Sequence, residues 1–408
     1  MIAAPEQRAP SRSMTELQNA KSRPRVMFIT LAPPENHCGI RLVMHRHLIE
    51  RNPFELLVVT DATYVTQELP HEQLQLPSAI ERLRRTRFHR WAKDFRTLVW
   101  PNLPNGQIAR LVGKFRPEVI LTVGDNAVCG LAWQTAKRFK LPLAGLFLDW
   151  FPIMDGYSGH RWTRPLLSAR YRRLYSACDL AICTSDGMQE VLGPHPNSHV
   201  VYPMPGRHKT NEALPRASVQ RNGKFRLVYV GCVEHFYGRM LCSVIERLQA
   251  DQDIELIVVG PNADWPPRLL ELAKARGVYL GFKPAEEAAQ VLAGADGLLV
   301  VMSFESESRL FMQTSFTTKF LDYSAYGKPI ILWGPDYCTP VKVARRDGGA
   351  LVVDQSGVES LMEAARRIAS DQSLRQRLSD EATRLHRGLF NPERLQEILV
   401  REVSALVN

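Results

Sequence analysis

The segment SFTTKFLDYSAYGKPIILWG at 315–334 carries side chains that suit an anionic ligand. Thr317 and Thr318 are expected to begin a helix whose first turn contains Lys319. Asp322 follows one turn later on the same face. The free N–H groups and positive end of such a helix suit a diphosphate, and Lys319 adds a full charge. Asp322 can accept hydrogen bonds from ribose hydroxyls, although an ordinary capped helix with a solvated lysine and aspartate has the same pattern.

Short β-branched runs recur along the chain, each followed by a turn and then by a helical pattern, as in βα units around a parallel sheet. In the first half we predict strands at 26–30, 56–60, 118–123, 143–148, 179–184 and 199–202. In the second half we predict strands at 226–231, 254–260, 278–282, 297–302, 329–334 and 350–353. The sequence therefore predicts an α/β fold with two Rossmann-like, doubly wound domains that face a cleft, where open sheets bind ligands.

Changes in composition indicate where these domains begin and end. A stretch without periodicity, rich in Pro, Arg, Asn and Gly, interrupts the strand pattern near residue 206. The expected parts are a disordered leader over 1–24, an N-terminal acceptor domain over 25–205, a linker over 206–224, a C-terminal nucleotide-binding domain over 225–385 and a final helix over 386–408. The apolar face of that helix must pack on something, and we expect it to cross back to the N-terminal domain.

Composition narrows the class of protein. Hydrophobic residues make up 45% and charged residues 23%, as in a globular protein. Apolar runs are shorter than the roughly 20 residues that a membrane-spanning helix needs, and residues 1–24 lack the apolar segment of a secretory signal, so we expect a cytoplasmic location. The seven scattered cysteines are expected to be free thiols, and no metal site is expected. The net charge of +10 favours an anionic partner, but no nucleic-acid-binding motif accompanies it.

The segment 315–334 resembles the donor site of glycosyltransferase family 4, also called group 1, in its branch with the pattern S-x-P-[ST]-K-[LF]-x-[ED]-Y-x-A-x-G-[KR]-P. The matching residues are Ser315, Thr318, Lys319, Phe320, Asp322, Tyr323, Ala325, Gly327, Lys328 and Pro329. The resemblance is clear from 226 to 353 and weak in the N-terminal half. It implies a GT-B fold and transfer of a sugar from a nucleoside diphosphate sugar to an acceptor hydroxyl. It also implies retention of anomeric configuration, without a metal or other cofactor.

Three further segments of the second half resemble the same family. VYVGCVEHFYGR at 228–239 is similar to its first strand and Gly turn, which approach the phosphates. IVVGPNADW at 257–265 is similar to the next strand and turn, and the segment from 278 to 301 is similar to its base-recognition loop. The residues that the resemblance assigns to the donor site here are Gly231, Cys232, Arg239, Gly281, Phe282 and Lys283, with Arg239 as a basic phosphate contact. Each segment alone is also compatible with an ordinary Rossmann turn.

The N-terminal half supplies candidates for the acceptor side. Gly39 begins a helix where the family places a glycine close to the donor, although a tight turn alone would also explain it. Asp149, in LFLDWFP, resembles the D-L-W-P segment of the same branch. At the end of a buried strand it would orient or deprotonate the acceptor hydroxyl, or else cap a helix or pair with an arginine. His37 and His160 are alternatives for the acceptor-side group.

One departure from the family leaves the activity open. Many family 4 enzymes carry paired glutamates spaced E-x7-E, whereas here Asp322 takes the second position and Thr314 the first. A catalytically silent protein that binds a nucleotide sugar or a partner is therefore one alternative. A nucleotide-sugar epimerase of the same architecture is another.

Residues 81–98 combine a cationic face with an apolar stripe. The stripe is Phe88, Trp91, Phe95 and Leu98, at helical spacing. The basic residues are Arg82, Arg84, Arg85, Arg87, Arg90, Lys93 and Arg96. One helix of this kind would suit peripheral contact with an anionic membrane, at the inner membrane surface, and a lipid-linked acceptor would explain it. The expected acceptor is a glycan, a lipid-linked molecule or a small molecule. A core-facing stripe with a solvated arginine face is the alternative.

Overall fold

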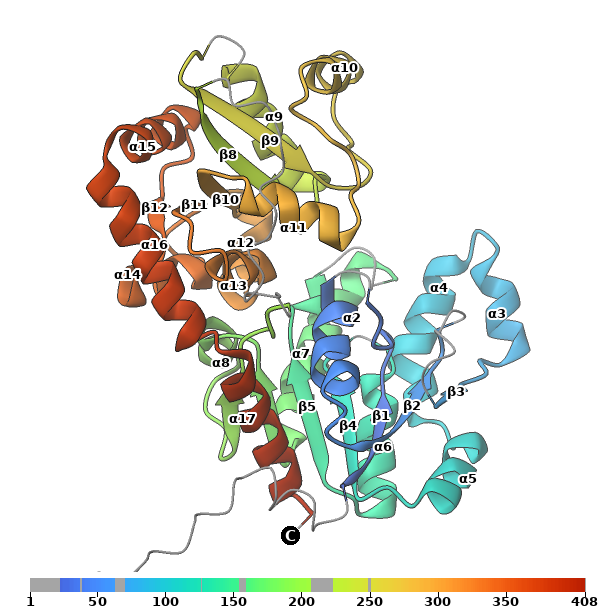
Figure 1. Cartoon of the computed structure of the whole chain (residues 1–408). Coiled ribbons are helices and arrows are strands. Elements are labelled where there is room, and N and C mark those ends of the chain that lie inside the picture. Colours follow the sequence, from blue (N-terminus) through green and yellow to red (C-terminus); the bar gives the residue numbers. More distant parts are fainter. Residues whose placement is uncertain are drawn as a thin grey trace, which may run out of the picture.

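The computed structural model describes residues 23–36, 39–62, 70–125, 127–153, 159–206, 223–248 and 251–407. Most of the expected leader and most of the expected linker lie outside these residues, as does His37. Within the described part, two α/β units follow one another along the chain and lie one above the other in Figure 1.

The first unit contains a sheet of parallel strands in the order β3-β2-β1-β4-β5-β6-β7. Its strands are β1 (Arg25–Ile29), β2 (Glu55–Thr60), β3 (His71–Gln73), β4 (Val119–Val123), β5 (Leu143–Phe147), β6 (Leu180–Cys183) and β7 (Ser198–Val200). The six strands predicted in this half are all present. Strand β3 was not predicted, because its sequence HEQ has no apolar residue and it pairs only at the edge of the sheet.

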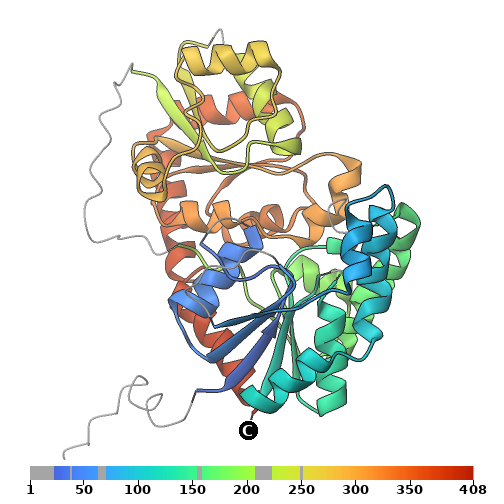
Figure 2. The ribbon, with the colours of Figure 1, turned by 90° about the vertical axis from the view of Figure 1, so that its right-hand side faces the viewer.

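Helices of the first unit connect these strands. They are α2 (Gly39–Met44), continued by η1 (His45–Glu50), α3 (Ser78–Arg84), α4 (His89–Asp94), continued by η2 (Phe95–Val99) and η3 (Trp100–Asn102), α5 (Gly106–Phe115), α6 (Cys129–Phe139), η4 (Phe151–Ile153), η5 (Arg161–Thr163), α7 (Arg164–Ala177) and α8 (Asp186–Leu192). In Figure 2 the sheet lies between helices on either side.

The second unit contains parallel strands in the order β12-β11-β10-β8-β9. They are β8 (Phe225–Val230), β9 (Ile254–Val259), β10 (Gly297–Val301), β11 (Ile330–Trp333) and β12 (Leu351–Val353). The prediction of a strand at 278–282 is wrong. Only Tyr279 pairs, through one bridge to Val258, and the chain then turns at Gly281, whose φ is +68°.

Helices of the second unit are α9 (His235–Leu248), α10 (Pro267–Ala275), α11 (Ala285–Ala293), η6 (Ser306–Ser308), α12 (Arg309–Thr314), α13 (Thr318–Ser324), α14 (Thr339–Asp347), α15 (Val358–Ser370), α16 (Gln372–Arg387) and α17 (Pro392–Ala405). Alternation of strands and helices around two parallel sheets confirms the predicted fold class.

Side chains on both faces of each sheet are buried. In β1, Val26 and Phe28 enter one core, whereas Met27 and Ile29 enter another on the opposite face. The core that contains Phe28 continues into the second unit, where it includes Val300 of β10. The two units are therefore joined by shared apolar packing, which resists their separation.

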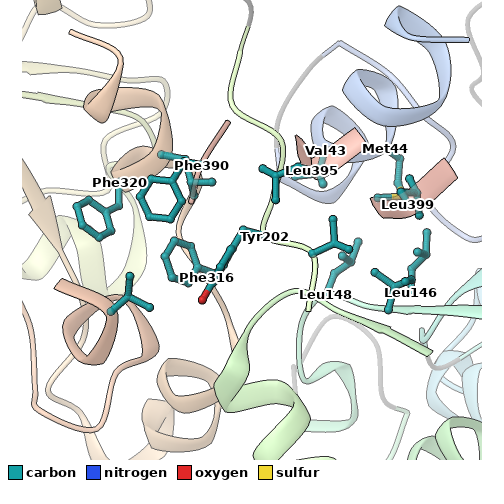
Figure 3. Close-up of a cluster of buried hydrophobic side chains, with 14 of the residues drawn as sticks. Val43, Met44, Leu146, Leu148, Tyr202, Phe316, Phe320, Phe390, Leu395 and Leu399 are labelled. Atoms are coloured by element: carbon teal, nitrogen blue, oxygen red, sulfur yellow. The ribbon is translucent and has the colours of Figure 1, made fainter. Parts of the chain in front are cut away.

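Aromatic rings form the centre of this junction (Figure 3). Tyr202 lies 4.7 Å from Phe316, measured between ring centroids, and Phe390 lies 5.7 Å from Phe316 and 5.4 Å from Phe320. All four side chains are buried. Because Phe316 and Phe320 flank the start of α13, this packing fixes α13 against the end of the first unit.

The last helix, α17, runs along the first unit (Figure 1). Its buried residues Leu395 and Leu399 belong to the same core as Val43, Met44 and Leu146 (Figure 3). Helix α17 therefore closes the chain across the junction, on the face of the first sheet that α2 also covers.

The segment 81–98 differs from the single helix that its pattern predicts. Helix α3 ends at Arg84, and α4 begins only at His89. Phe88 is 44% exposed and Trp91 is 56% exposed. The alternative of a core-facing stripe is therefore wrong for these two residues, which face solvent.

Candidate active site

Lys319 lies over the turn that follows β8. Its ammonium is 5.3 Å from the centroid of the Tyr229 ring and 4.5 Å from that of Tyr237. Gly231, in that turn, has a φ of +144°, and a Cβ built on it would overlap the Lys319 side chain, 3.0 Å from Nζ. Two residues predicted for the donor site, far apart in sequence, are thus in contact, and the glycine leaves room for the lysine.

A tyrosine holds α13 in this position. The Tyr323 hydroxyl accepts a hydrogen bond from Val230 N at 2.8 Å and donates one to Val230 O at 3.1 Å. Tyr323 is 2% exposed. Because both bonds go to the last residue of β8, the helix that carries Lys319 cannot shift along the strand without breaking them.

Burial changes the acidity of Lys319. It lowers the pKa of the ammonium to about 8, against the opposing effects of Cys232 and Asp322. An ammonium that is poorly solvated and surrounded by ring faces gains more from an anionic ligand than a solvated lysine does. The arrangement therefore suits a phosphate.

The start of α13 differs in detail from its prediction. Thr317 precedes the helix, but its side chain makes no capping hydrogen bond, and the helix is only seven residues long. The dipole of so short a helix is small, so Lys319 carries most of the positive charge at this end. Thr317 and Thr318 are half-buried beside it.

Two glycine turns lie beside that of Gly231. Gly260 N donates to Gly281 O at 3.0 Å, and a Cβ on Gly260 would overlap Gly231 O. Phe282, next to Gly281, is 70% exposed. The predicted phosphate turn and the predicted base loop are therefore adjacent, with an exposed ring at their edge.

The remaining donor-side candidates lie further toward solvent. Arg239, on α9, forms two hydrogen bonds of 2.8 Å with the Glu305 carboxylate. Lys283 pairs with Glu287 at 3.0 Å, and Cys232 is exposed. A phosphate contact by Arg239 remains a prediction, and it would require the guanidinium to exchange or share its partner Glu305.

Asp322 joins three parts of the chain. Its Oδ1 accepts hydrogen bonds from Arg46 Nη1 at 3.1 Å and from Gly206 N at 2.8 Å. Arg46 also donates to Met204 O at 2.8 Å and is 9% exposed. The carboxylate predicted to hold a ribose thus also ties α13 to η1 of the first unit and to the chain that connects the two units.

Asp149 lies just beyond β5 and meets the donor segment. Its Oδ1 accepts a hydrogen bond of 2.5 Å from the Ser315 hydroxyl, and its backbone carbonyl accepts one of 3.0 Å from Tyr171. Burial raises the pKa of the Asp149 carboxyl, whereas the bond from Ser315 lowers it. The acceptor-side carboxylate predicted from the sequence is therefore linked directly to the first residue of the donor motif.

A second contact between the units involves the position of the missing glutamate. Thr314 is fully buried, its hydroxyl donates to Leu310 O at 2.8 Å, and its carbonyl accepts from Ser185 at 2.6 Å. At this position the chain therefore has a packed helix residue and no carboxylate.

The other acceptor-side candidates have different surroundings. Gly39 is the first residue of α2, with a φ of +57° and open space around it, so its backbone conformation explains the glycine. His160 Nδ1 lies 2.5 Å from Asp94 Oδ2. Thr163 also donates to this buried carboxylate, at 3.1 Å. His160 is thus held by α4, beside the Trp91 ring.

Four residues of this region were missed by sequence reasoning. Tyr229 and Tyr237 form the ring contacts of Lys319, Tyr323 anchors α13, and Arg46 binds Asp322. Tyr323 lies inside the family pattern and could have been singled out. The other three lie in strand and helix patterns that predict only burial.

Replacing Gly231 with alanine should weaken nucleotide binding by about tenfold or more, because the new Cβ displaces Lys319 and the backbone is strained by roughly 1–2 kcal/mol. Calorimetric titration with a nucleoside diphosphate measures this loss. Gly277→Ala is the matched control, since its φ is +68° but its Cβ would meet no atom within 4 Å. Equal losses in the two variants would attribute the effect to backbone strain alone.

The described part of the chain contains no group of three or more His, Cys, Asp or Glu side chains arranged to hold a metal ion. None of its helices is long and apolar enough to span a membrane.

Comparison with known proteins agrees with the resemblance. Residues 224–371 match the model of the family glycosyl transferases group 1. No curated protein matches the sequence of the chain significantly.

Several solved structures have the same fold. HepE from Anabaena is similar at a TM-score of 0.68 and 13% identity, over 93% of this chain and 100% of its own. Sucrose-phosphate synthase from Thermosynechococcus elongatus is similar at a TM-score of 0.63 and 13% identity, over 94% of this chain and 99% of its own. A Listeria monocytogenes protein described as a UDP-N-acetylglucosamine 2-epimerase is similar at a TM-score of 0.55 and 12% identity, over 94% of this chain and 96% of its own.

The family match and the fold confirm the family resemblance and the GT-B fold expected from the sequence. Residues 224–371 match the group 1 glycosyltransferase family, and the chain as a whole has the GT-B fold of the solved structures to which it is similar.

Proposed function

We propose that this protein transfers a sugar from a nucleoside diphosphate sugar to an acceptor hydroxyl where the two units meet. One observation carries the proposal: Lys319, poised over the Gly231 turn, belongs to the same short segment whose Ser315 binds Asp149. A group that suits a leaving phosphate and a group that suits an acceptor are thus joined at one interface.

On the donor side, Lys319 and Thr318 bind the diphosphate and Arg239 approaches from α9. The bonds from Arg46 and Gly206 both go to Oδ1 of Asp322, so we assign Oδ2 to the ribose hydroxyls. HepE has been solved with UDP and with UDP-glucose, which favours uridine as the base. Gly281, Phe282 and Lys283 would then contact the uracil.

In the reaction, the acceptor oxygen forms a bond to the anomeric carbon as the bond from that carbon to the diphosphate oxygen breaks. Lys319 stabilises the negative charge that develops on the diphosphate, a role worth about 10²–10³ in rate for a single preorganised donor. Asp149 orients the acceptor hydroxyl or takes its proton. Retention of configuration and independence of metal and other cofactors are part of the proposal, on the resemblance alone.

A thermal-shift panel of UDP, GDP, dTDP and ADP sugars tests the donor side. We expect a UDP sugar to raise the melting temperature most, because binding to the folded state stabilises it. Transfer further requires that nucleoside diphosphate is released only when an acceptor is present. Binding without release would support the catalytically silent alternative, and a changed donor sugar without release would support an epimerase.

We also propose that the enzyme works at a cytoplasmic membrane surface. Trp91 and Trp162 are 56% and 59% exposed, with centroids 6.4 Å apart, and Phe88 and Leu166 are exposed as well. We call these four side chains the aromatic surface. The same two segments of the chain contain five exposed basic residues, Arg84, Arg85, Arg87, Arg90 and Arg161. Exposed indoles among arginines suit the interface of an anionic bilayer.

The double substitution Trp91→Ser/Trp162→Ser should therefore reduce binding to vesicles that contain anionic lipid by about tenfold or more, measured by co-sedimentation. Phe282→Ser, at an exposed ring of the other unit, is the control and should leave vesicle binding unchanged. Wild-type protein that fails to bind anionic vesicles at low salt would contradict the membrane proposal.

A further inference from the structure

A pocket of about 540 Å³ opens beside α3 in the first unit. Its apolar wall includes Leu74, which is buried, and its polar groups include Asp61, Arg82 and Arg85. The pocket is large enough for one sugar residue and its substituents. None of its lining residues belongs to the donor site described above.

Asp61 supplies a free, buried acceptor to this pocket. It directly follows β2, and its side chain is 1% exposed. Arg96 pairs with Oδ2, whereas the buried Oδ1 has no hydrogen-bond partner. A buried carboxylate oxygen without a partner is costly, so a ligand hydroxyl that donates to it gains affinity.

Arginines of α3 line the outer part of the pocket. Arg84 pairs with Glu81 at 2.8 Å, whereas Arg82 and Arg85 are exposed. With Arg96 neutralising Asp61, cations outnumber carboxylates here. A phosphate or carboxylate on the ligand would complete the balance of charge.

The pocket lies at the same edge of the first sheet as Asp149. The strands are parallel, so Asp61 after β2 and Asp149 after β5 both lie at the carboxyl edge. Burial raises the pKa of Asp125, after β4, and the charge of Asp61 adds to this rise, so these two carboxylates are neighbours. The pocket is therefore at the same edge of the sheet as Asp149, with β1 and β4 between β2 and β5.

We propose that this pocket selects the acceptor through a sugar residue other than the one that reacts at Asp149: it binds a sugar that carries an anionic group, with a hydroxyl on Asp61 Oδ1 and a phosphate or carboxylate on Arg82 and Arg85. This inference rests on the proposed transferase function. It assigns a chemical class, an anionic sugar, to an acceptor that the donor-site resemblance leaves unspecified. The anionic sugar is either free or attached to a lipid.

The test compares matched sugars at saturating UDP, so that the donor site is filled. Methyl glucuronide and glucose 6-phosphate should bind the full-length protein at least about tenfold more tightly than methyl glucoside, measured by calorimetry. Arg82→Gln/Arg85→Gln should abolish that preference. Arg110→Gln/Lys114→Gln, on the exposed face of α5, should retain it. Asp61→Asn should weaken the binding of all three sugars, with folding checked by the melting temperature.

Equal affinities for charged and neutral sugars, or an unchanged preference in Arg82→Gln/Arg85→Gln, would overturn the proposal. Glucose 6-phosphate carried on a dodecyl chain in phosphatidylcholine vesicles distinguishes the two sources. Tighter binding than that of the free sugar assigns the site to a lipid-linked acceptor, and equal binding assigns it to a free one. If UDP itself fails to bind, the transferase proposal fails while the sugar measurement still decides the pocket.

Discussion

Replacing Lys319 with methionine is expected to weaken UDP binding about 10- to 100-fold, because a charge-assisted hydrogen bond contributes about 1.5–3 kcal/mol. Methionine keeps the unbranched apolar stem between the Tyr229 and Tyr237 rings and removes only the charge. Transfer should fall by a further factor of about 10²–10³, because the charge on the leaving diphosphate loses its stabilising group. Calorimetry with UDP and single-turnover rates measure the two losses separately.

The pH dependence of the same site follows from the pKa of Lys319, which is about 8 in the folded protein, whereas that of a solvated lysine is 10.5. UDP affinity of the wild type should decrease as the pH rises through 8, because the neutral amine no longer attracts phosphate. The free energy of unfolding should rise between pH 8 and 10.5, since the unfolded state binds more protons there.

At pH 7 the charged Lys319 therefore lowers the free energy of unfolding. Without nucleotide, Lys319→Met should be at least as stable as the wild type. A variant that unfolds more easily and loses UDP binding only for that reason would contradict this role. UDP-dependent stabilisation equal to that of the wild type would refute the assignment of Lys319 to the phosphate.

The substitution Asp149→Asn is expected to reduce transfer by about 10²–10³ while leaving UDP affinity unchanged. Asparagine keeps an oxygen that accepts the hydrogen bond from Ser315, so the interface is preserved and only the carboxylate is lost. Burial raises the pKa of Asp149 above 3.8, so its ionised form is destabilising at neutral pH. The variant should therefore not be less stable than the wild type at pH 7.

The pH profile separates a reacting carboxylate from a structural one. Wild-type activity should fall as the pH drops through the raised pKa of Asp149, and Asp149→Asn should lack this limb. Ser315→Ala removes a bond that lowers this pKa, so its acid limb should move to higher pH with a smaller loss of rate. An Asp149→Asn variant with wild-type activity would show that another group acts on the acceptor.

Much of the fold could be predicted because parallel strands buried on both faces read as continuous apolar runs. Strands such as β4 and β10 were found in this way. The edge strand β3 could not be found in this way, since its pairing is made by the backbone alone. The segment 278–282 was mistaken for a strand because it is apolar, but it forms only a single bridge and then a glycine turn.

The candidate site was predictable only where the chemistry is local. Lys319 and Asp322 lie in one short motif, and Gly231 lies in a recognisable turn, so their meeting could be expected from the family pattern. The Asp149–Ser315 bond and the Arg46–Asp322 pair depend on how the two units dock, which no local pattern encodes. The break between α3 and α4 likewise interrupts the single helix that the pattern predicts, and Phe88 and Trp91 are exposed.

The most direct test of the proposed sugar transfer follows labelled sugar from UDP-glucose into a panel of anionic and neutral acceptors, using the wild type, Lys319→Met and Asp149→Asn. We expect that the wild type forms labelled acceptor and releases one UDP for each sugar transferred, and that both variants lose this activity while remaining folded. Donor that binds but stays intact with every acceptor, or donor sugar that is epimerised without release of UDP, would contradict it.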